Sequence, residues 1–185
     1  MNGRYITISP ITLGSEASVC YWSKTTVNGK MVWTSSAFSE KLNIYEKDIY
    51  TLNTGDGNNN PFQNNGSNIN VLHDGLWHHF AVTFGNNESK LYIDGEYRGT
   101  AINFRSPAIT NGQIKLAGGY NKTHTYDWNG QIDDFRVYDN CLSPKEVKEI
   151  SQGLVLHYKL DGSTFNIDAS DYFLLPKGLE LYDYI

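Results

Sequence analysis

The sequence predicts an all-β domain, an antiparallel sandwich of two sheets with one short helix near its C-terminal end. Apolar residues recur at every second position in about ten short segments, which is the period of a strand with one buried face. The 185 residues include 13 Tyr, 8 Phe, 4 Trp and 17 Gly but only 5 Pro, a composition that suits strands joined by tight turns. Only one segment, late in the chain, has a helical pattern.

Strand patterns follow one another along the first third of the chain. They cover residues 3–9, 17–25, 31–36 and 42–52, the last being a hairpin broken near residues 46–48. Residues 54–68 (TGDGNNNPFQNNGSN) contain six Asn and three Gly, and this composition predicts a loop. A short strand is expected after it, at residues 69–72.

The clearest strand pattern covers residues 77–84 (WHHFAVTF). Phe80, Val82 and Phe84 share one face and mark it as the core side, while the opposite face carries small or polar residues. His78 and His79 point to opposite faces, so the two imidazoles cannot share one metal ion. We expect Trp77 to pack and at least one imidazole to bond to a backbone group or a carboxylate.

A hairpin is predicted directly after this strand. Asp94 and Gly95 stand between strand patterns at residues 91–93 and 96–100, and Asp-Gly in that position is a strong turn signal. Two further strands are expected, at residues 113–116 and 130–138.

The single helix is predicted at residues 143–151 (SPKEVKEIS). Ser143 is the N-cap, Pro144 occupies the first helical position, and Glu146 completes a capping box. Val147 and Ile150 are spaced to face the sandwich.

Charge and cysteine content exclude several classes. The net charge is −5, from 15 basic and 20 acidic residues, and the basic residues do not cluster. A nucleic-acid groove is therefore not expected, because phosphates require a concentrated cationic face. No apolar run approaches the roughly 20 residues that span a bilayer, so membrane insertion is not expected either. Unpaired thiols at Cys20 and Cys141 are favoured over a bridge, because a core of this size needs no disulfide.

Four short motifs occur in a fixed order over the second half of the chain. They are DGxWHHxAVT at residues 74–83, LYxDG at 91–95, GxIDDxRxY at 130–138 and LSxxEV at 142–147. With this order and spacing, residues 3–151 resemble the laminin-G-like, or concanavalin A-like, lectin superfamily. The most similar subgroup is that of pentraxin-like modules and of modules repeated in phage tail and bacterial surface proteins. The resemblance implies a two-sheet antiparallel jelly roll. It also places Cys20 at one half of a pentraxin disulfide whose other position is Ala81 here, which supports an unpaired thiol.

The resemblance divides the chain into two parts. Residues 1–152 correspond to a sandwich domain without the opening strand of the family, and residues 153–185 resemble the start of a following module. The segment that begins at Leu154 and ends at Gly162 reads LVLHYKLDG, the phrase with which family members open. We expect Leu154 to Leu160 to complete the vacant sheet position, either within the chain or in a neighbouring copy by self-association.

Two groups of oxygen-bearing side chains are candidates for a calcium site. Asp56, Asn58 and Asn60 alternate as in calcium loops but lack a bidentate Glu, so a solvated loop is favoured over calcium. Asp133 faces inward if Phe135 and Val137 do, unless a bulge turns Ile132 inward instead. One carboxylate there needs a partner, and a structural role is favoured over calcium. Relatives in the superfamily often bind calcium at loop rims.

The ligand-binding candidates are aromatic and polar residues in predicted loops or at strand ends. A pyranose has an apolar face that stacks on Tyr or Trp, so exposed aromatics indicate sugar binding. The best segment is residues 118–129 (GGYNKTHTYDWN). The candidates are Tyr120, His124, Tyr126, Asp127, Trp128 and, in an earlier strand, Trp33.

The resemblance implies non-catalytic adhesion to a glycan or glycoprotein, in a phage virion or tail or on a bacterial cell surface. Laminarinase-type hydrolases of the superfamily carry Glu-x-Asp-x-x-Glu, whereas the string that starts at Glu46 has no second Glu in place. We therefore expect no enzyme activity. Two alternatives stay open: a structural spacer or assembly module with protein–protein contacts only, and a glycoside hydrolase whose carboxylates are not recognised.

Overall fold

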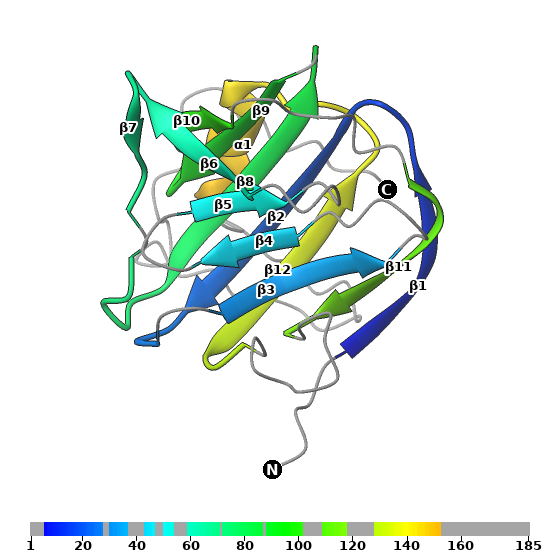
Figure 1. Cartoon of the computed structure of the whole chain (residues 1–185), viewed down its shortest axis with the longest axis horizontal. Coiled ribbons are helices and arrows are strands. Elements are labelled where there is room, and N and C mark those ends of the chain that lie inside the picture. Colours follow the sequence, from blue (N-terminus) through cyan, green and yellow to red (C-terminus); the bar gives the residue numbers. More distant parts are fainter. Residues whose placement is uncertain are drawn as a thin grey trace, which may run out of the picture.

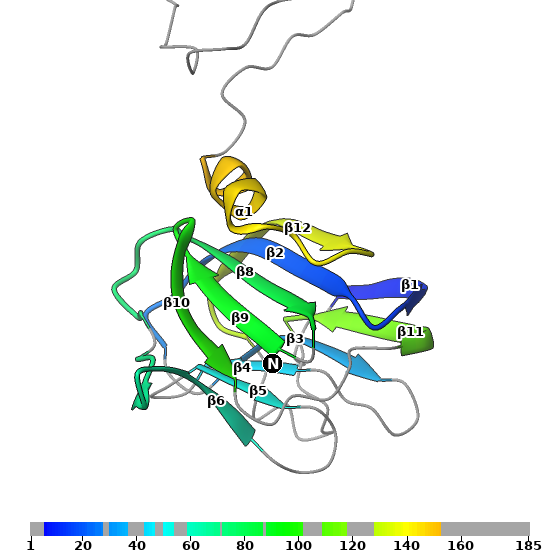
Figure 2. The same cartoon turned by 90° about the horizontal axis from the view of Figure 1, so that it is seen from above.

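The protein folds into two layers of strands with one helix on an outer face (Figures 1 and 2). The computed structural model describes residues 6–27, 30–36, 43–46, 50–53, 59–70, 72–86, 88–101, 109–117 and 128–152. The elements in these ranges are β1 (Ile6–Leu13), β2 (Ala17–Lys24), β3 (Lys30–Ser36), β4 (Asn43–Glu46), β5 (Tyr50–Asn53), β6 (Asn59–Asn64), β7 (Ser67–Asn68), β8 (His78–Gly85), β9 (Glu88–Ile93), β10 (Glu96–Ala101), β11 (Ile109–Leu116), β12 (Gln131–Tyr138) and α1 (Pro144–Ser151).

The strands form one hydrogen-bonded path that folds back on itself. One layer has the order β1-β11-β3-β4-β5-β6, and the other has the order β6-β10-β9-β8-β2-β12, with β7 attached to β6. β6 belongs to both layers, because its first half pairs with β5 and its second half with β10. Every strand pair among the described residues is antiparallel. The predicted all-β sandwich is confirmed, closed on one side by β6 and ending on the other at β1 and β12.

The main core lies between the two layers. Phe80, Val82 and Phe84 on β8 are at most 2% exposed, as their alternation predicts. Tyr21 on the neighbouring strand β2 stacks on Phe80, with ring centroids 5.4 Å apart. Phe62 on β6 is also fully buried in this core.

The outer face of β8 is also covered. His79, Ala81 and Thr83 are all buried, although the sequence marks this face only by small or polar side chains. α1 lies across this face of the layer that contains β2, β8 and β12 (Figure 2). Val147 and Ile150 pack with Ala81 in a second, smaller core, so the predicted orientation of the helix is confirmed.

The predicted capping box begins α1. The Ser143 hydroxyl accepts a hydrogen bond from Glu146 N at 3.3 Å, and Ser143 N donates to the Glu146 carboxylate at 2.7 Å. Two backbone donors at the start of the helix are thereby satisfied. In the part of the chain that the structure describes, no helix has the length and apolarity needed to cross a membrane.

We expect Ser143→Ala to lower the free energy of unfolding by about 1 kcal/mol, because it leaves the Glu146 N–H without its capping acceptor. Ser143→Asp restores a side-chain acceptor at the same position and should cost much less. Urea unfolding of both variants beside the parent protein checks this. Equal stability of the two variants would mean that the cap contributes nothing.

The last turn of α1 rests on the turn between β9 and β10. A Cβ atom at Gly95 (φ 77°) would overlap the Ser151 hydroxyl and lie 3.2 Å from the Lys148 Cα. The Lys148 ammonium forms an ion pair with Glu96 on β10 at 2.9 Å. These contacts fix the C-terminal end of the helix above β9 and β10.

Several predicted segments differ from the structure, including the strands expected at residues 91–93 and 113–116, which begin earlier, at Glu88 and Ile109. The expected loop at residues 54–68 contains β6 and β7, because the burial of Phe62 and a tight Asn65-Gly66 turn outweigh the polar composition. Of residues 69–72, the structure describes Ile69, Asn70 and Leu72, and among these only Asn70 is in a β-bridge, although Ile69 N donates to Phe62 O at 3.0 Å and the Ile69 side chain packs on the core. β1 continues to Leu13, beyond its expected end, through shifts of register on both sides of Ile11.

Both cysteines are free, as predicted. Cys20 on β2 lies directly opposite Ala81 on β8, so the second half of the pentraxin-type bridge is absent. Burial raises the pKa of the Cys20 thiol to about 12, which keeps it protonated and unreactive near neutral pH.

Candidate functional site

Several loops gather at the end of the sandwich where β2 and β9 finish and β8 and β12 begin. Gly75 N donates to Thr25 O at 3.0 Å, and the Thr25 hydroxyl donates to Asn129 O at 2.7 Å. Thr25 thus ties the loop that precedes β8 to the segment that precedes β12. We call this surface the loop end, and it comprises residues 25–27, 72–77, 94–95 and 128–130.

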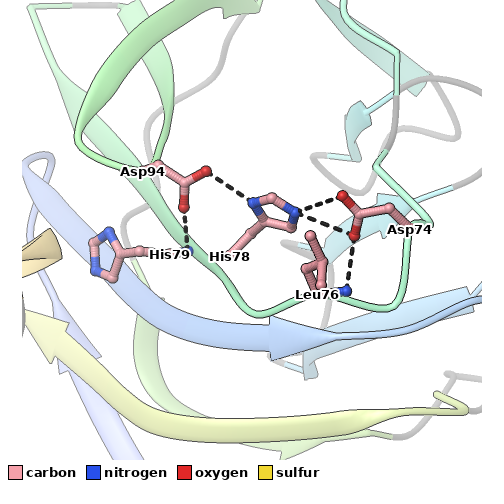
Figure 3. Close-up of polar contacts among 5 residues, drawn as sticks. All are labelled: Asp74, Leu76, His78, His79 and Asp94. Atoms are coloured by element: carbon pink, nitrogen blue, oxygen red, sulfur yellow. Dashed lines mark hydrogen bonds and ion pairs between the residues drawn. The ribbon is translucent and has the colours of Figure 1, made fainter.

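His78 holds two carboxylates of the loop end in place (Figure 3). Its Nδ1 lies 2.8 Å from the Asp94 carboxylate, and its Nε2 lies 3.1 Å from the Asp74 carboxylate. Asp94 also accepts from His79 N at 2.9 Å, and Asp74 accepts from Leu76 N at 2.8 Å. Each carboxylate is therefore bound by the imidazole and by a backbone N–H.

These hydrogen bonds favour the charged imidazole. Partial burial opposes the charge, but the hydrogen bonds with Asp94 and Asp74 outweigh it, so the pKa of His78 is raised. The pKa of Asp74 is lowered, first by the Leu76 N–H and then by His78. The expected bond between an imidazole and a carboxylate is confirmed. The separation of His78 from His79 is also confirmed, because His79 lies buried on the outer face beside Trp22.

Two large apolar side chains are exposed next to the fixed carboxylates. Leu76 is 62% exposed and Trp77 is 41% exposed. Trp77 therefore packs only in part, because this residue precedes β8 and lies outside its pleat. The Asp74 and Asp94 side chains keep 45% and 43% of their own surface exposed, so their free lone pairs face solvent. An accessible indole can stack on an apolar ligand face, and oriented carboxylates can accept hydrogen bonds from hydroxyl groups.

A hollow of about 350 Å³ lies beside the loop end, between β1 and β12, the two terminal strands of the hydrogen-bonded path. Its lining residues are Ile6, Leu116, Ala117, Trp128, Gly130, Ile132, Asp133, Asp134 and Phe135. Trp128 N donates to Ala117 O at 3.0 Å, which closes the base of the segment between them. This segment, residues 118–127, carries most of the predicted ligand-binding residues.

A bulge in β12 shapes one wall of the hollow. The register to β2 shifts between Asp133 and Arg136, and Asp134 adopts a left-handed conformation with φ 47°. Ile132 and Phe135 consequently both pack against the core, which is the bulged alternative of the prediction. Asp133 is exposed and accepts from Asp134 N at 2.8 Å, while Asp134 receives two hydrogen bonds from Arg136 at 2.6 and 2.7 Å.

Comparison with known proteins identifies the family. A family model described as "Concanavalin A-like lectin/glucanases superfamily" matches residues 1–148. The chain belongs to this superfamily. A mouse protein with sushi, von Willebrand factor type A, EGF and pentraxin domains is 31% identical over 58% of the chain, which spans 4% of that protein.

Solved structures of the superfamily share the fold at low identity. A heptameric pentraxin from Limulus polyphemus has a TM-score of 0.66 at 16% identity, over 80% of this chain and 75% of its own. Domain 4 of an extracellular arabinanase from Geobacillus stearothermophilus, solved with arabinotriose, has a TM-score of 0.63 at 18% identity, over 82% of this chain and 75% of its own. The predicted concanavalin A-like jelly roll with pentraxin-like relatives is confirmed.

The structure describes only some of the residues that the sequence predicts for the site. Trp128 is half-buried in the hollow and Asp133 is exposed on its wall. Trp33 lies in β3 and Asn60 in β6, so Asn60 belongs to a strand and not to the expected loop. The predicted residues outside the described ranges are Asp56, Asn58, Tyr120, His124, Tyr126 and Asp127. Among the described residues, no three His, Cys, Asp or Glu side chains form a group that could hold a metal ion.

The bridge from Asp74 through His78 to Asp94 was not predicted. Asp74 and Asp94 belong to two of the family motifs, but the sequence indicates only a turn role for Asp94. The register of the β8–β9 hairpin brings them together, since Asp94 N donates to His79 O at 2.8 Å. A usable signal was the occurrence of one Asp four residues before His78 and another directly after the partner strand.

Proposed function

We propose that this module binds glycans through its loop end. The proposal rests on two observations at the loop end: Trp77 is exposed, and the neighbouring residue His78 fixes the Asp74 and Asp94 carboxylates in place. A sugar ring can stack its apolar face on the indole while its hydroxyl groups donate to the carboxylates. Because both carboxylates are already held by hydrogen bonds, little conformational entropy is lost on binding.

The segment at residues 118–127 connects Ala117 to Trp128 in the chain, and the next residue, Asn129, accepts a hydrogen bond from Thr25 at the loop end. We propose that its aromatic and polar residues supply further sugar contacts, together with Trp33. The arabinotriose complex of a structural relative supports a sugar ligand for this fold.

We also propose the setting that the family motifs suggest, a phage virion or tail protein or a bacterial surface protein. Single glycan-binding modules bind weakly, and many copies on one particle raise the overall avidity by about 10²–10⁴. Adhesion to a cell surface is the role that fits such an arrangement.

The proposal predicts that Trp77→Ala weakens glycan binding at least about fivefold, because the stacking surface is lost. Binding to a printed array of plant, bacterial and animal glycans identifies the ligand, and titration with the best glycan gives the affinity. Tyr97→Ala is the matched control, because Tyr97 is a comparably exposed aromatic (46%) on β10, and it should bind as the parent does. Equal binding by Trp77→Ala and the parent overturns the assignment of this site.

The same titration decides the role of calcium. His78 already bonds to both Asp74 and Asp94 and occupies one side of each carboxylate, so we expect binding to persist when calcium is chelated. Loss of binding on chelation would point instead to the oxygen ligands at Asp56, Asn58, Asn60 or Asp133. Turnover of a polysaccharide panel that disappears in Asp133→Asn would support the hydrolase alternative.

A further inference from the structure

The strand path ends at two edges that have no partner among the described residues. β12 pairs only with β2, and β1 pairs only with β11. Among the described residues, no strand pairs with the outward edge of β12, and such an edge can accept a further strand. The hollow described above lies between these two edges.

The hollow presents apolar surface where a further strand would lie. Ile6 on β1 is 65% exposed, and Ile132 and Phe135 on β12 are only half-buried. The Trp128 indole N–H is buried without a hydrogen-bond partner in the part of the chain described. Buried polar groups almost always have a partner, so a backbone carbonyl in the hollow would satisfy this indole.

One segment of this chain has the pattern that fits such an edge. From Leu154 to Leu160 the sequence LVLHYKL places Leu, Leu, Tyr and Leu on one face and Val, His and Lys on the other. This period of two is typical of a strand with one apolar face. The apolar face matches the wall of the hollow.

The position of α1 prevents Leu154 from reaching the β12 edge of its own copy, so the whole segment cannot lie along that edge. The last turn of α1 lies on Gly95, between β9 and β10. The layer continues as β9-β8-β2-β12, so the vacant position is four strand spacings from β9, about 19 Å away. Leu154 follows Ser151 by three residues, which span at most about 11 Å.

We propose that the segment from Leu154 to Leu160 of one copy adds as a strand to β12 of a second copy, with its leucines in the hollow. The donating segment and the accepting edge are different surfaces, so the association is head-to-tail and forms rings or open chains. This inference does not depend on glycan binding. It also chooses between the two alternatives left open by the sequence, insertion within the chain and exchange with a neighbouring copy.

The test measures the mass of the full chain by sedimentation velocity between about 1 and 100 μM, a range in which strand exchange between copies is detectable. The parent should form assemblies larger than a monomer. Leu156→Asp places a charge on the apolar face of the donating segment and should be monomeric. His157→Asp places the same charge on the opposite face and should assemble as the parent does.

A complementation experiment makes the test specific. Ile6→Asp places a charge at the exposed mouth of the hollow and should also give monomers, with the donating segment intact. An equal mixture of Ile6→Asp and Leu156→Asp should yield dimers, because one variant can still donate and the other can still accept. A monomeric parent at 100 μM, assemblies that persist in Leu156→Asp, or a mixture that stays monomeric would each overturn the proposal.

Discussion

Replacing Phe80 by alanine should lower the free energy of unfolding by about 3–5 kcal/mol, the largest effect of a single core substitution that we expect. Phe80 is 2% exposed at the centre of β8, and its ring stacks on Tyr21. Alanine removes the buried ring surface and leaves a cavity that the rigid neighbouring strands cannot fill. Because a domain of this size is stable by only about 5–15 kcal/mol, much of the stability would be lost.

Chemical unfolding followed by tryptophan fluorescence measures this effect. Leu76→Ala is the matched control, because Leu76 is also a large apolar residue but is 62% exposed. The control should change the stability by less than about 0.5 kcal/mol. A loss of under 1 kcal/mol for Phe80→Ala would mean that the layers do not pack as described.

The strands that the sequence predicts well are those in which local and tertiary preferences agree. Residues 77–84 alternate without interruption, and β8 pairs on both sides with long neighbours. The turn at Asp94 and Gly95 and the capping box at Ser143 depend on local backbone geometry, so a few residues suffice to identify them.

The segments that the sequence predicts poorly depend on contacts between residues that are far apart in the chain. β6 is rich in Asn, and its strand conformation comes from pairing with β5 and β10 and from the burial of Phe62. The outer face of β8 looks solvent-facing in sequence because the helix that covers it comes some sixty residues later. Short-range patterns contain no information about such coverage.

The candidate site likewise has some features that local sequence predicts and others that depend on distant contacts. The sequence predicts that an imidazole meets a carboxylate, but the two partners of His78 are set by a turn and a hairpin register. The bulge at Asp134 was one of two open alternatives, because alternation alone cannot show where an extra residue is inserted.

Trp128 belongs both to the loop end and to the wall of the hollow. A strand added along β12 would cover the hollow that Trp128 lines, so the indole would be occupied in an assembled module. Sugar contacts would then come from Trp77, which does not line the hollow, and from residues 118–127 as proposed above. Glycan binding and assembly can therefore coexist, and head-to-tail copies would present several loop ends to one surface.

His79 should make the protein less stable in acid. Burial lowers the pKa of His79 to about 4, helped by Arg136 and opposed by Asp94 and Asp134. The unfolded chain binds a proton near the ordinary value of 6.5, whereas the folded protein resists protonation until about pH 4. Stability is therefore lost as the pH falls from about 7 towards 4, by about 2–3 kcal/mol for this one group.

The titration of His78 changes stability in the opposite direction to that of His79, so variants of the two neighbouring histidines can be compared with each other. Its raised pKa adds stability that is fully present below the unfolded value and is lost as the pH rises through the folded value. Unfolding free energies at pH 7.5 and 4.5 should show a smaller acid loss in His79→Gln than in the parent and a larger one in His78→Gln. His79→Gln removes only one imidazole from the titration, whereas His78→Gln also removes the contribution of His78 to the lowered pKa of Asp74, so its difference from the parent reports on the pair. Identical acid losses in the parent and His79→Gln would show that the buried imidazole is not kept neutral by its surroundings.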